Sequence, residues 1–249
     1  MPPSDALPAT RPPCANCGTP VDAAFCGHCG QAWPAHRLTL PHLLAEVPHA
    51  AFHLDRGFLP TLWGLATRPG ATIAAYLDGR RRALFNPLTF MLVTAAVYVL
   101  VRTWTVAAPG PGATAEARAW VHFSTSLALT LALQLPATAL VTWLVFRRAQ
   151  RAYGEHLAAH AFIFGVTALL GAAVLPIGTL LPRPAALTLF YASNIAYQLW
   201  ALMALFRTTP GPRWRVPLEA VVALAIYTAL NTATLTAVAR LVAHYGPSA

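Results

Sequence analysis

Long runs of apolar residues dominate the chain from residue 84 onward and are separated by short polar segments. Five runs of 18 to 26 residues can be delimited: 84–101, 121–146, 157–181, 185–206 and 216–239. As α-helices they would be roughly 27 to 39 Å long, which suits a hydrocarbon core of about 30 Å. None shows the apolar–polar alternation of a barrel strand, so the pattern predicts five transmembrane helices.

The first 83 residues follow a different pattern. Residues 1–13 hold five prolines and no apolar run, which predicts a disordered leader. Residues 14–35 contain every cysteine of the chain. Residues 36–83 are apolar only in patches too short to span a bilayer, and the spacing of these patches predicts amphipathic helices at the membrane surface. The five-span membrane domain then covers 84–240, and 241–249 form a tail.

The composition agrees with a chain that is solvated by lipid. Hydrophobic residues make up 57% of the sequence and charged residues 10%, whereas an ordinary soluble domain is about 25% charged. So few charges cannot cover a water-soluble globule of this size, which excludes a soluble enzyme of the usual kind. The net charge is +9, but the arginines flank the apolar runs and form no dense basic patch. The positive balance therefore predicts membrane topology and gives no reason to expect nucleic acid as a partner.

The distribution of arginine predicts the orientation. Thirteen of the 17 arginines lie before the first span or in the loops after the second and fourth spans, while Arg102, Arg118, Arg183 and Arg240 fall on the other side. Positively charged loops are retained in the cytoplasm. We therefore expect a bacterial inner-membrane protein with a cytoplasmic N-terminus and an external C-terminus.

Three consecutive arginines stand directly before the first span: Arg80, Arg81 and Arg82. A basic cluster at this position attracts anionic lipid by about 1 kcal/mol per charge. We expect this triplet to contact anionic lipid and also to fix the orientation of the first span.

The four cysteines form two C-x-x-C pairs, Cys14/Cys17 and Cys26/Cys29, and a glycine follows each pair. Two such knuckles direct four thiolates to one centre, which predicts one structural Zn²⁺ per chain in a closed site. Two disulfides, disfavoured in the cytoplasm, and a rubredoxin-like iron site are the alternatives. A ribbon of this size, residues 14–35, cannot bury an adequate core, so we expect metal removal to unfold it and leave the spans intact.

Four polar residues share one stripe of the segment 40–54: His42, Glu46, His49 and His53. Three imidazoles and a carboxylate could bind a second metal ion or sense pH. The same stripe is also what the wet face of a helix in the headgroup region looks like, and Pro48 would kink the stripe and disturb the alignment of four ligands. We therefore favour the wet face over a second metal site.

Polar residues are scarce inside the predicted spans. No Asp, Glu, Lys or Arg lies well inside one, and His122 and His160 fall near span ends, which argues against a proton-coupled pump. The uncharged polar residues, which could pack helices together or line a pathway, are Gln134, Asn194, Gln198 and Asn231.

The N-terminal part of the chain resembles an uncharacterised bacterial membrane-protein family in which a zinc-ribbon head precedes several spans. The resemblance rests on FCGHCGQ at 25–31, RPG at 68–70, YLDGRR at 76–81 and NP at 86–87, and it covers residues 14 to about 100. This family is a domain of unknown function, so the resemblance implies an architecture and supplies no activity or catalytic residue.

Together these features predict an all-α polytopic membrane protein with a small N-terminal four-cysteine zinc ribbon and amphipathic juxtamembrane helices. We expect no enzymatic activity, but an adaptor or membrane-organising role in which the ribbon binds a protein partner, and the sequence is compatible with an oligomer. Two alternatives are a permease or channel for a neutral or apolar solute, lined by the four intramembrane polar residues, and a lipid-modifying enzyme that uses the histidine stripe.

Overall fold

The computed structural model describes residues 13–33, 38, 57–105 and 127–245, and the regular elements in these ranges are helices. In chain order they are α3 (Phe58–Thr67), α4 (Pro69–Leu77), α5 (Pro87–Thr105), α7 (Leu127–Val145), the 3₁₀-helix η1 (Arg147–Ala149), α8 (Tyr153–Gly178), α9 (Arg183–Phe206) and α10 (Arg215–Tyr245). Within the described ranges, β-pairing is limited to two isolated bridges near the cysteines. The predicted all-α class is confirmed.

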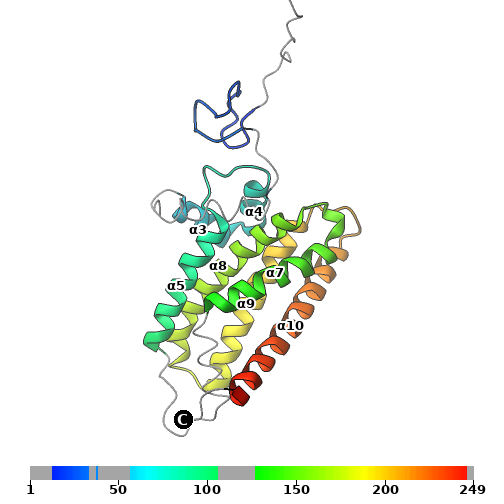
Figure 1. Cartoon of the computed structure of the whole chain (residues 1–249). Coiled ribbons are helices and arrows are strands. Elements are labelled where there is room, and N and C mark those ends of the chain that lie inside the picture. The colour runs from blue at the N-terminus through cyan, green and yellow to red at the C-terminus, as the bar shows by residue number, and fades with distance from the viewer. Residues whose placement is uncertain (1–12, 34–37, 39–56, 106–126, 246–249) are drawn as a thin grey trace, which may run out of the picture.

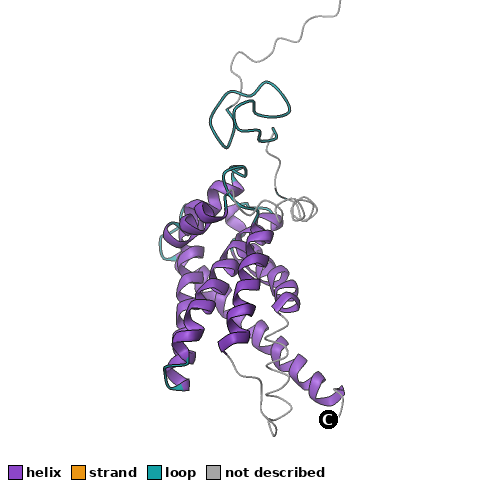
Figure 2. Ribbon diagram, turned by 90° about the vertical axis from the view of Figure 1, so that its left-hand side faces the viewer, coloured by secondary structure: helices purple, strands orange, loops and turns teal. Residues whose placement is uncertain are grey.

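The five long helices run side by side as one bundle, with α3 and α4 at one end and the cysteine segment beyond them (Figures 1 and 2). Helix α8 is central, because it packs against α5, α7 and α9, while α10 packs against α7 and α9. Aromatic contacts join the central helix to its neighbours. The ring of Phe162 in α8 meets the ring of Tyr76 in α4 edge-on, with the ring centres 5.3 Å apart, and its centre is 5.9 Å from that of Phe90 in α5.

Three of the long helices, α5, α8 and α9, are long and apolar enough to cross a bilayer. Their lengths of 19, 26 and 24 residues and their apolar composition indicate a membrane protein. Helices α7 and α10 coincide with the other two predicted runs, and residues Gln134–Val145 of α7 form a shorter apolar helix.

The first span begins and ends later than the apolar run suggests, at Pro87 and Thr105 where we predicted 84 and 101. Its start is set by Asn86, whose side-chain oxygen accepts hydrogen bonds from the amides of Leu88 (3.0 Å) and Thr89 (3.2 Å). Asparagine at the N-cap followed by proline at the first helical position is a strong start signal. At the other end the helix continues through Arg102, which is buried.

Helices α3 and α4 are fixed to the bundle by a close backbone approach. A Cβ on Gly70 of α4 would overlap the carbonyl group of Ala204 in α9 and lie 2.6 Å from the Leu205 nitrogen. The Tyr197 hydroxyl of α9 donates a hydrogen bond to the Leu65 carbonyl of α3 at 3.1 Å. Gly70 therefore permits the contact that seats the two short helices.

The outer face of α3 is apolar and exposed. Leu59 and Trp63, one turn apart, are 74% and 71% exposed, whereas Leu65 on the inner face is fully buried. An apolar outer face beside the spans suits a helix that lies in the headgroup region.

The arginine-rich loops gather at this same end of the bundle. Arg151, after η1, forms a 2.8 Å ion pair with Asp78, directly after α4. The loop between α9 and α10 is also there, since Gly211 lies close to the guanidinium of Arg148. Three segments that we predicted to be cytoplasmic thus share one end of the molecule.

Replacing Gly70 with alanine should destabilise the protein by about 1–3 kcal/mol, because the added methyl group forces α4 away from the α9 backbone. Gly178→Ala is the matched control: its added Cβ meets a single methyl group at 3.4 Å, an ordinary contact. Thermal unfolding of the detergent-purified variants measures both effects. Equal melting temperatures for Gly70→Ala and Gly178→Ala would contradict the close packing of α4 on α9.

Candidate metal centre

Two similar turns bring the cysteines together. In each turn the first cysteine amide donates to a carbonyl five residues on, to Thr19 at 2.9 Å and to Gln31 at 2.8 Å, and the glycine amide donates back to that cysteine's carbonyl at 2.8 Å. Gly18 and Gly30 have φ angles of 78° and 72°, a conformation that glycine adopts without strain. The glycine after each C-x-x-C pair is therefore required by the turn.

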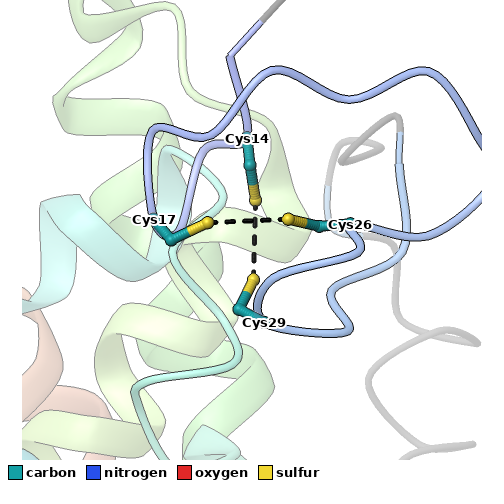
Figure 3. A group of neighbouring side chains, drawn as sticks. All are labelled: Cys14, Cys17, Cys26 and Cys29. Atoms are coloured by element: carbon teal, nitrogen blue, oxygen red, sulfur yellow. Dashed lines mark hydrogen bonds between the residues drawn. The ribbon is translucent and has the colours of Figure 1, made fainter.

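The four sulfur atoms point toward one centre (Figure 3). Cys14 and Cys29 sulfurs are 3.7 Å apart, those of Cys17 and Cys26 are 3.5 Å apart, and all four lie within 4.8 Å of one another. A metal ion held tetrahedrally by thiolates at about 2.3 Å gives sulfur–sulfur edges of about 3.8 Å. These separations are too long for disulfides, and the four cysteines are free thiols. The cluster could therefore hold one metal ion.

The electrostatics of the cluster also favour a cation. Side-chain and backbone hydrogen bonds with Thr19 lower the pKa of the Cys17 thiol to about 5. The Gln31 amide lowers the pKa of Cys29, but burial and the adjacent Cys17 thiol outweigh it and raise the value to about 11. Hydrogen bonds among the thiols therefore lower the pKa of Cys17 and raise the pKa of Cys29, whereas a bound metal ion would favour the thiolate form of both.

Two of the four cysteines are shielded from solvent. Cys14 and Cys26 are buried, together with Val21, while His28 in the second turn is exposed. Four thiolates complete a tetrahedral shell, so the arrangement suits a structural ion and leaves no position for a reacting water.

Two side chains of the cysteine segment bind the loop between α4 and α5, which the sequence did not predict. The Gln31 side chain donates to the Gly79 carbonyl at 2.8 Å and accepts from the amides of Arg81 and Arg82, both at 3.1 Å. Asn16 accepts from the Ala83 amide at 3.1 Å. Both residues sit on the turns that the cysteines form, so the turns hold this loop.

This contact gives a role to two of the sequence motifs. Gln31 ends FCGHCGQ and Gly79 to Arg81 end YLDGRR, although almost 50 residues separate them in the chain. Gly79 has a φ of 107°, so the tight turn that presents its carbonyl is one that few other residues could form. The backbone polar groups of the loop obtain partners from the cysteine segment.

The arginine triplet lies in this bound loop. Arg80 and Arg82 are exposed and Arg81 is half-buried. The loop therefore presents two guanidinium groups outward beside the first span.

Contacts are described for two of the four intramembrane polar residues, and both are contacts within or between helices. The Gln134 side chain accepts a hydrogen bond from the Tyr227 hydroxyl of α10 at 2.9 Å, and the Asn194 amide donates to its own helix at the Phe190 carbonyl, at 2.8 Å. Gln198 is half-buried on α9, and the Asn231 side chain lies outside the described residues. The contacts that are described are helix-packing contacts.

A different intramembrane cluster joins α7 and α8. The Thr142 hydroxyl lies 3.1 Å from Nδ1 of His156 and 3.0 Å from Nε2 of His160. Both imidazoles are 2% exposed. The apolar runs predict His160 near a span end, but α8 begins at Tyr153, so His160 lies two turns inside the helix and is buried. The sequence of α8 alone does not indicate this cluster, because the hydroxyl group that both imidazoles meet belongs to α7.

The predicted histidine stripe cannot be placed. His42, Glu46, His49 and His53 all fall within 39–56, outside the residues that the structure describes.

Replacing Gln31 with alanine should free the α4–α5 loop without removing the metal ligands. We expect hydrogen exchange of the Arg81 and Arg82 amides to accelerate by about tenfold. This factor corresponds to the free energy of the hydrogen bonds that these amides lose with the Gln31 side chain. His28→Ala, in the same turn but exposed, is the control. Unchanged exchange at these amides in Gln31→Ala would show that the cysteine segment does not hold the loop.

Comparison with known proteins gives one family match, over part of the chain, and no activity. Residues 55–99 match the family model described as a protein of unknown function, DUF3667. The matched stretch contains α3, α4 and most of α5, together with the loop that Gln31 binds. Neither a curated protein nor a solved structure matches the chain.

Proposed function

We propose that the protein is a non-enzymatic adaptor of the bacterial inner membrane, in which a structural zinc ribbon at the cytoplasmic surface holds a protein partner. The observation that carries this proposal is the attachment of the closed four-cysteine cluster to the loop before the first span, through Gln31 and Asn16. A closed metal site has no position for substrate. Its role is then to shape a surface and to fix that surface beside the membrane.

Zinc is the metal that we assign to the cluster. Four thiolates in tetrahedral positions suit Zn²⁺, and two short turns of this size gain their stability from the metal. The buried apolar core of the segment supports this assignment, because it comprises only Cys14, Val21 and Cys26 among the described residues. Without an ion, three buried residues cannot offset the entropy of ordering the segment.

The proposed topology has five spans with the ribbon inside the cell. It is supported by the five long helices that lie side by side and by the arginine loops that meet at the ribbon end. Such loops are retained in the cytoplasm. An odd number of spans then places the C-terminus outside.

The partner surface that we propose is the outward face of the ribbon. Phe25 and Trp33 flank the second turn, and their side chains are 63% and 37% exposed. Large aromatic side chains of this kind are frequent anchors in protein interfaces. Phe25 is exposed while Gln31 and Asn16 hold the α4–α5 loop, so a partner would meet Phe25 while the ribbon stays docked.

Replacing Cys14 and Cys17 with serine should lower the zinc content from one ion per chain to none, because two thiolates cannot close the shell. We expect proteolysis to cut the ribbon rapidly while the helical content and membrane integration persist. Elemental analysis and limited proteolysis measure these effects, with His28→Ala as the control that retains its zinc. Iron in place of zinc, or a protease-resistant ribbon in the double variant, would refute the assignment.

Replacing Phe25 with serine should weaken capture of the cytoplasmic partner by about fivefold or more, as expected for the loss of an aromatic anchor. The measurement is crosslinking in intact cells followed by quantitative mass spectrometry. Ala23→Ser, on an exposed neighbouring position, should leave capture unchanged. If the Cys14/Cys17 double variant and Phe25→Ser both capture the same proteins as the wild type, the adaptor role is excluded.

A further inference from the structure

A cavity of about 340 Å³ lies at the end of the bundle remote from the cysteines. It is lined by the last turns of α5 and α8 and the first turns of α9, and it is open on one side. Its lining is of two kinds. Arg102, Arg183 and the phenols of Tyr98 and Tyr191 contribute polar groups, and Leu187 and Phe190 contribute part of an apolar wall.

Arg102 is the group in this cavity that most needs a partner. It sits in the last turn of α5 and is 7% exposed. Among the described residues, none accepts a hydrogen bond from its guanidinium group or forms an ion pair with it. A buried cation without a counter-ion is strongly unfavourable, and charged groups retained within membrane helices mark functional sites. The cavity beside Arg102 is where a counter-ion would fit.

The other polar groups of the cavity suit an anion with several oxygen atoms. Arg183, the first residue of α9, is exposed and stands at the rim. The Tyr98 ring packs against Gly171 of α8, where an added Cβ would lie 2.9 Å from the ring, so its phenol is held in position. Two guanidinium groups and two hydroxyl donors are the groups that bind phosphate.

The apolar wall and the position of the cavity indicate that the anion carries a hydrocarbon chain. Trp104, in the last turn of α5, and Leu180, just after α8, are each 84% exposed at this end. An exposed tryptophan at the end of a span is typical of the boundary between headgroups and hydrocarbon. A ligand at this depth would place its charge near Arg102 and its chain along Leu187 and Phe190.

We propose that this cavity binds the phosphate headgroup of an anionic phospholipid, with Arg102 as the buried counter-ion and Arg183 at the entrance. This site is independent of the zinc ribbon and of the adaptor role, because it lies at the other end of the bundle. It gives the protein a lipid-specific contact in the leaflet opposite the ribbon.

The experiment is a titration of the full chain, purified in a non-ionic detergent, with phosphatidylglycerol. Bound lipid is counted by native mass spectrometry, and the melting temperature is followed in parallel. The wild type should bind phosphatidylglycerol and gain stability from it. Arg102→Met, which removes the charge and keeps an unbranched side chain, should lose about 30-fold in affinity. Arg213→Gln, at an exposed position near the ribbon end, is the control and should bind as the wild type does.

Two further arms separate the source of the anion and guard against misfolding. Inorganic phosphate at matched concentration should give little stabilisation, and equal stabilisation would mean that a soluble anion occupies the cavity and would overturn the lipid assignment. Arg183→Gln should weaken binding by a smaller factor, which tests the site even if Arg102→Met does not fold. Wild-type affinity for phosphatidylglycerol in a folded Arg102→Met protein, or in Arg183→Gln where Arg102→Met does not fold, would overturn the proposal.

Discussion

Hydrocarbon offers no hydrogen-bond partner to a backbone amide, and this constraint determines most of the architecture. Within the apolar runs each backbone group must be satisfied inside its own helix, so the runs form long helices that differ mainly in what their side chains contact. The polar side chains of these helices find their hydrogen-bond partners in two ways. Some bond to their own helix, as Asn194 does, and others find a partner across a helix contact, as Thr142 does with two imidazoles and Tyr227 does with Gln134.

The same constraint explains why the two ends of the bundle differ. At the ribbon end, backbone groups in the α4–α5 loop are beyond the helices and obtain partners from Gln31 and Asn16. At the remote end, the last turn of α5 carries Arg102 into a cavity that no described acidic side chain neutralises. One end is completed by a metal-stabilised segment of the chain itself, and we infer that the other is completed by lipid.

The parts of the structure that depend on neighbours in sequence could be predicted, and those that depend on distant residues could not. The cysteine cluster follows from short spacings within one segment, and the helices follow from the apolar runs. The apolar run predicts a span that begins at 157, whereas α8 begins at Tyr153, and the polar residues Glu155 and His156 in its first turn are buried. Glu155 accepts the Ala152 amide at 2.7 Å, and His156 meets Thr142 from α7. Hydropathy counts such residues as surface, whereas their burial depends on partners that only the fold supplies. The hydrogen bond between Gln31 and Gly79 and the cavity at Arg102 also bring together residues that are distant in the sequence, so the sequence alone does not indicate them.

The central claim is that a metal-stabilised ribbon lies on the cytoplasmic side of a bundle solvated by lipid, and its most direct test is the side of the membrane on which the ribbon is found. The measurement is protease cleavage of an N-terminal tag, compared between intact spheroplasts and inside-out membrane vesicles, with the protein sedimenting in the membrane fraction. The account predicts cleavage in the vesicles and protection in the spheroplasts. Cleavage in intact spheroplasts, or recovery of the full chain in the soluble fraction without detergent, would contradict it.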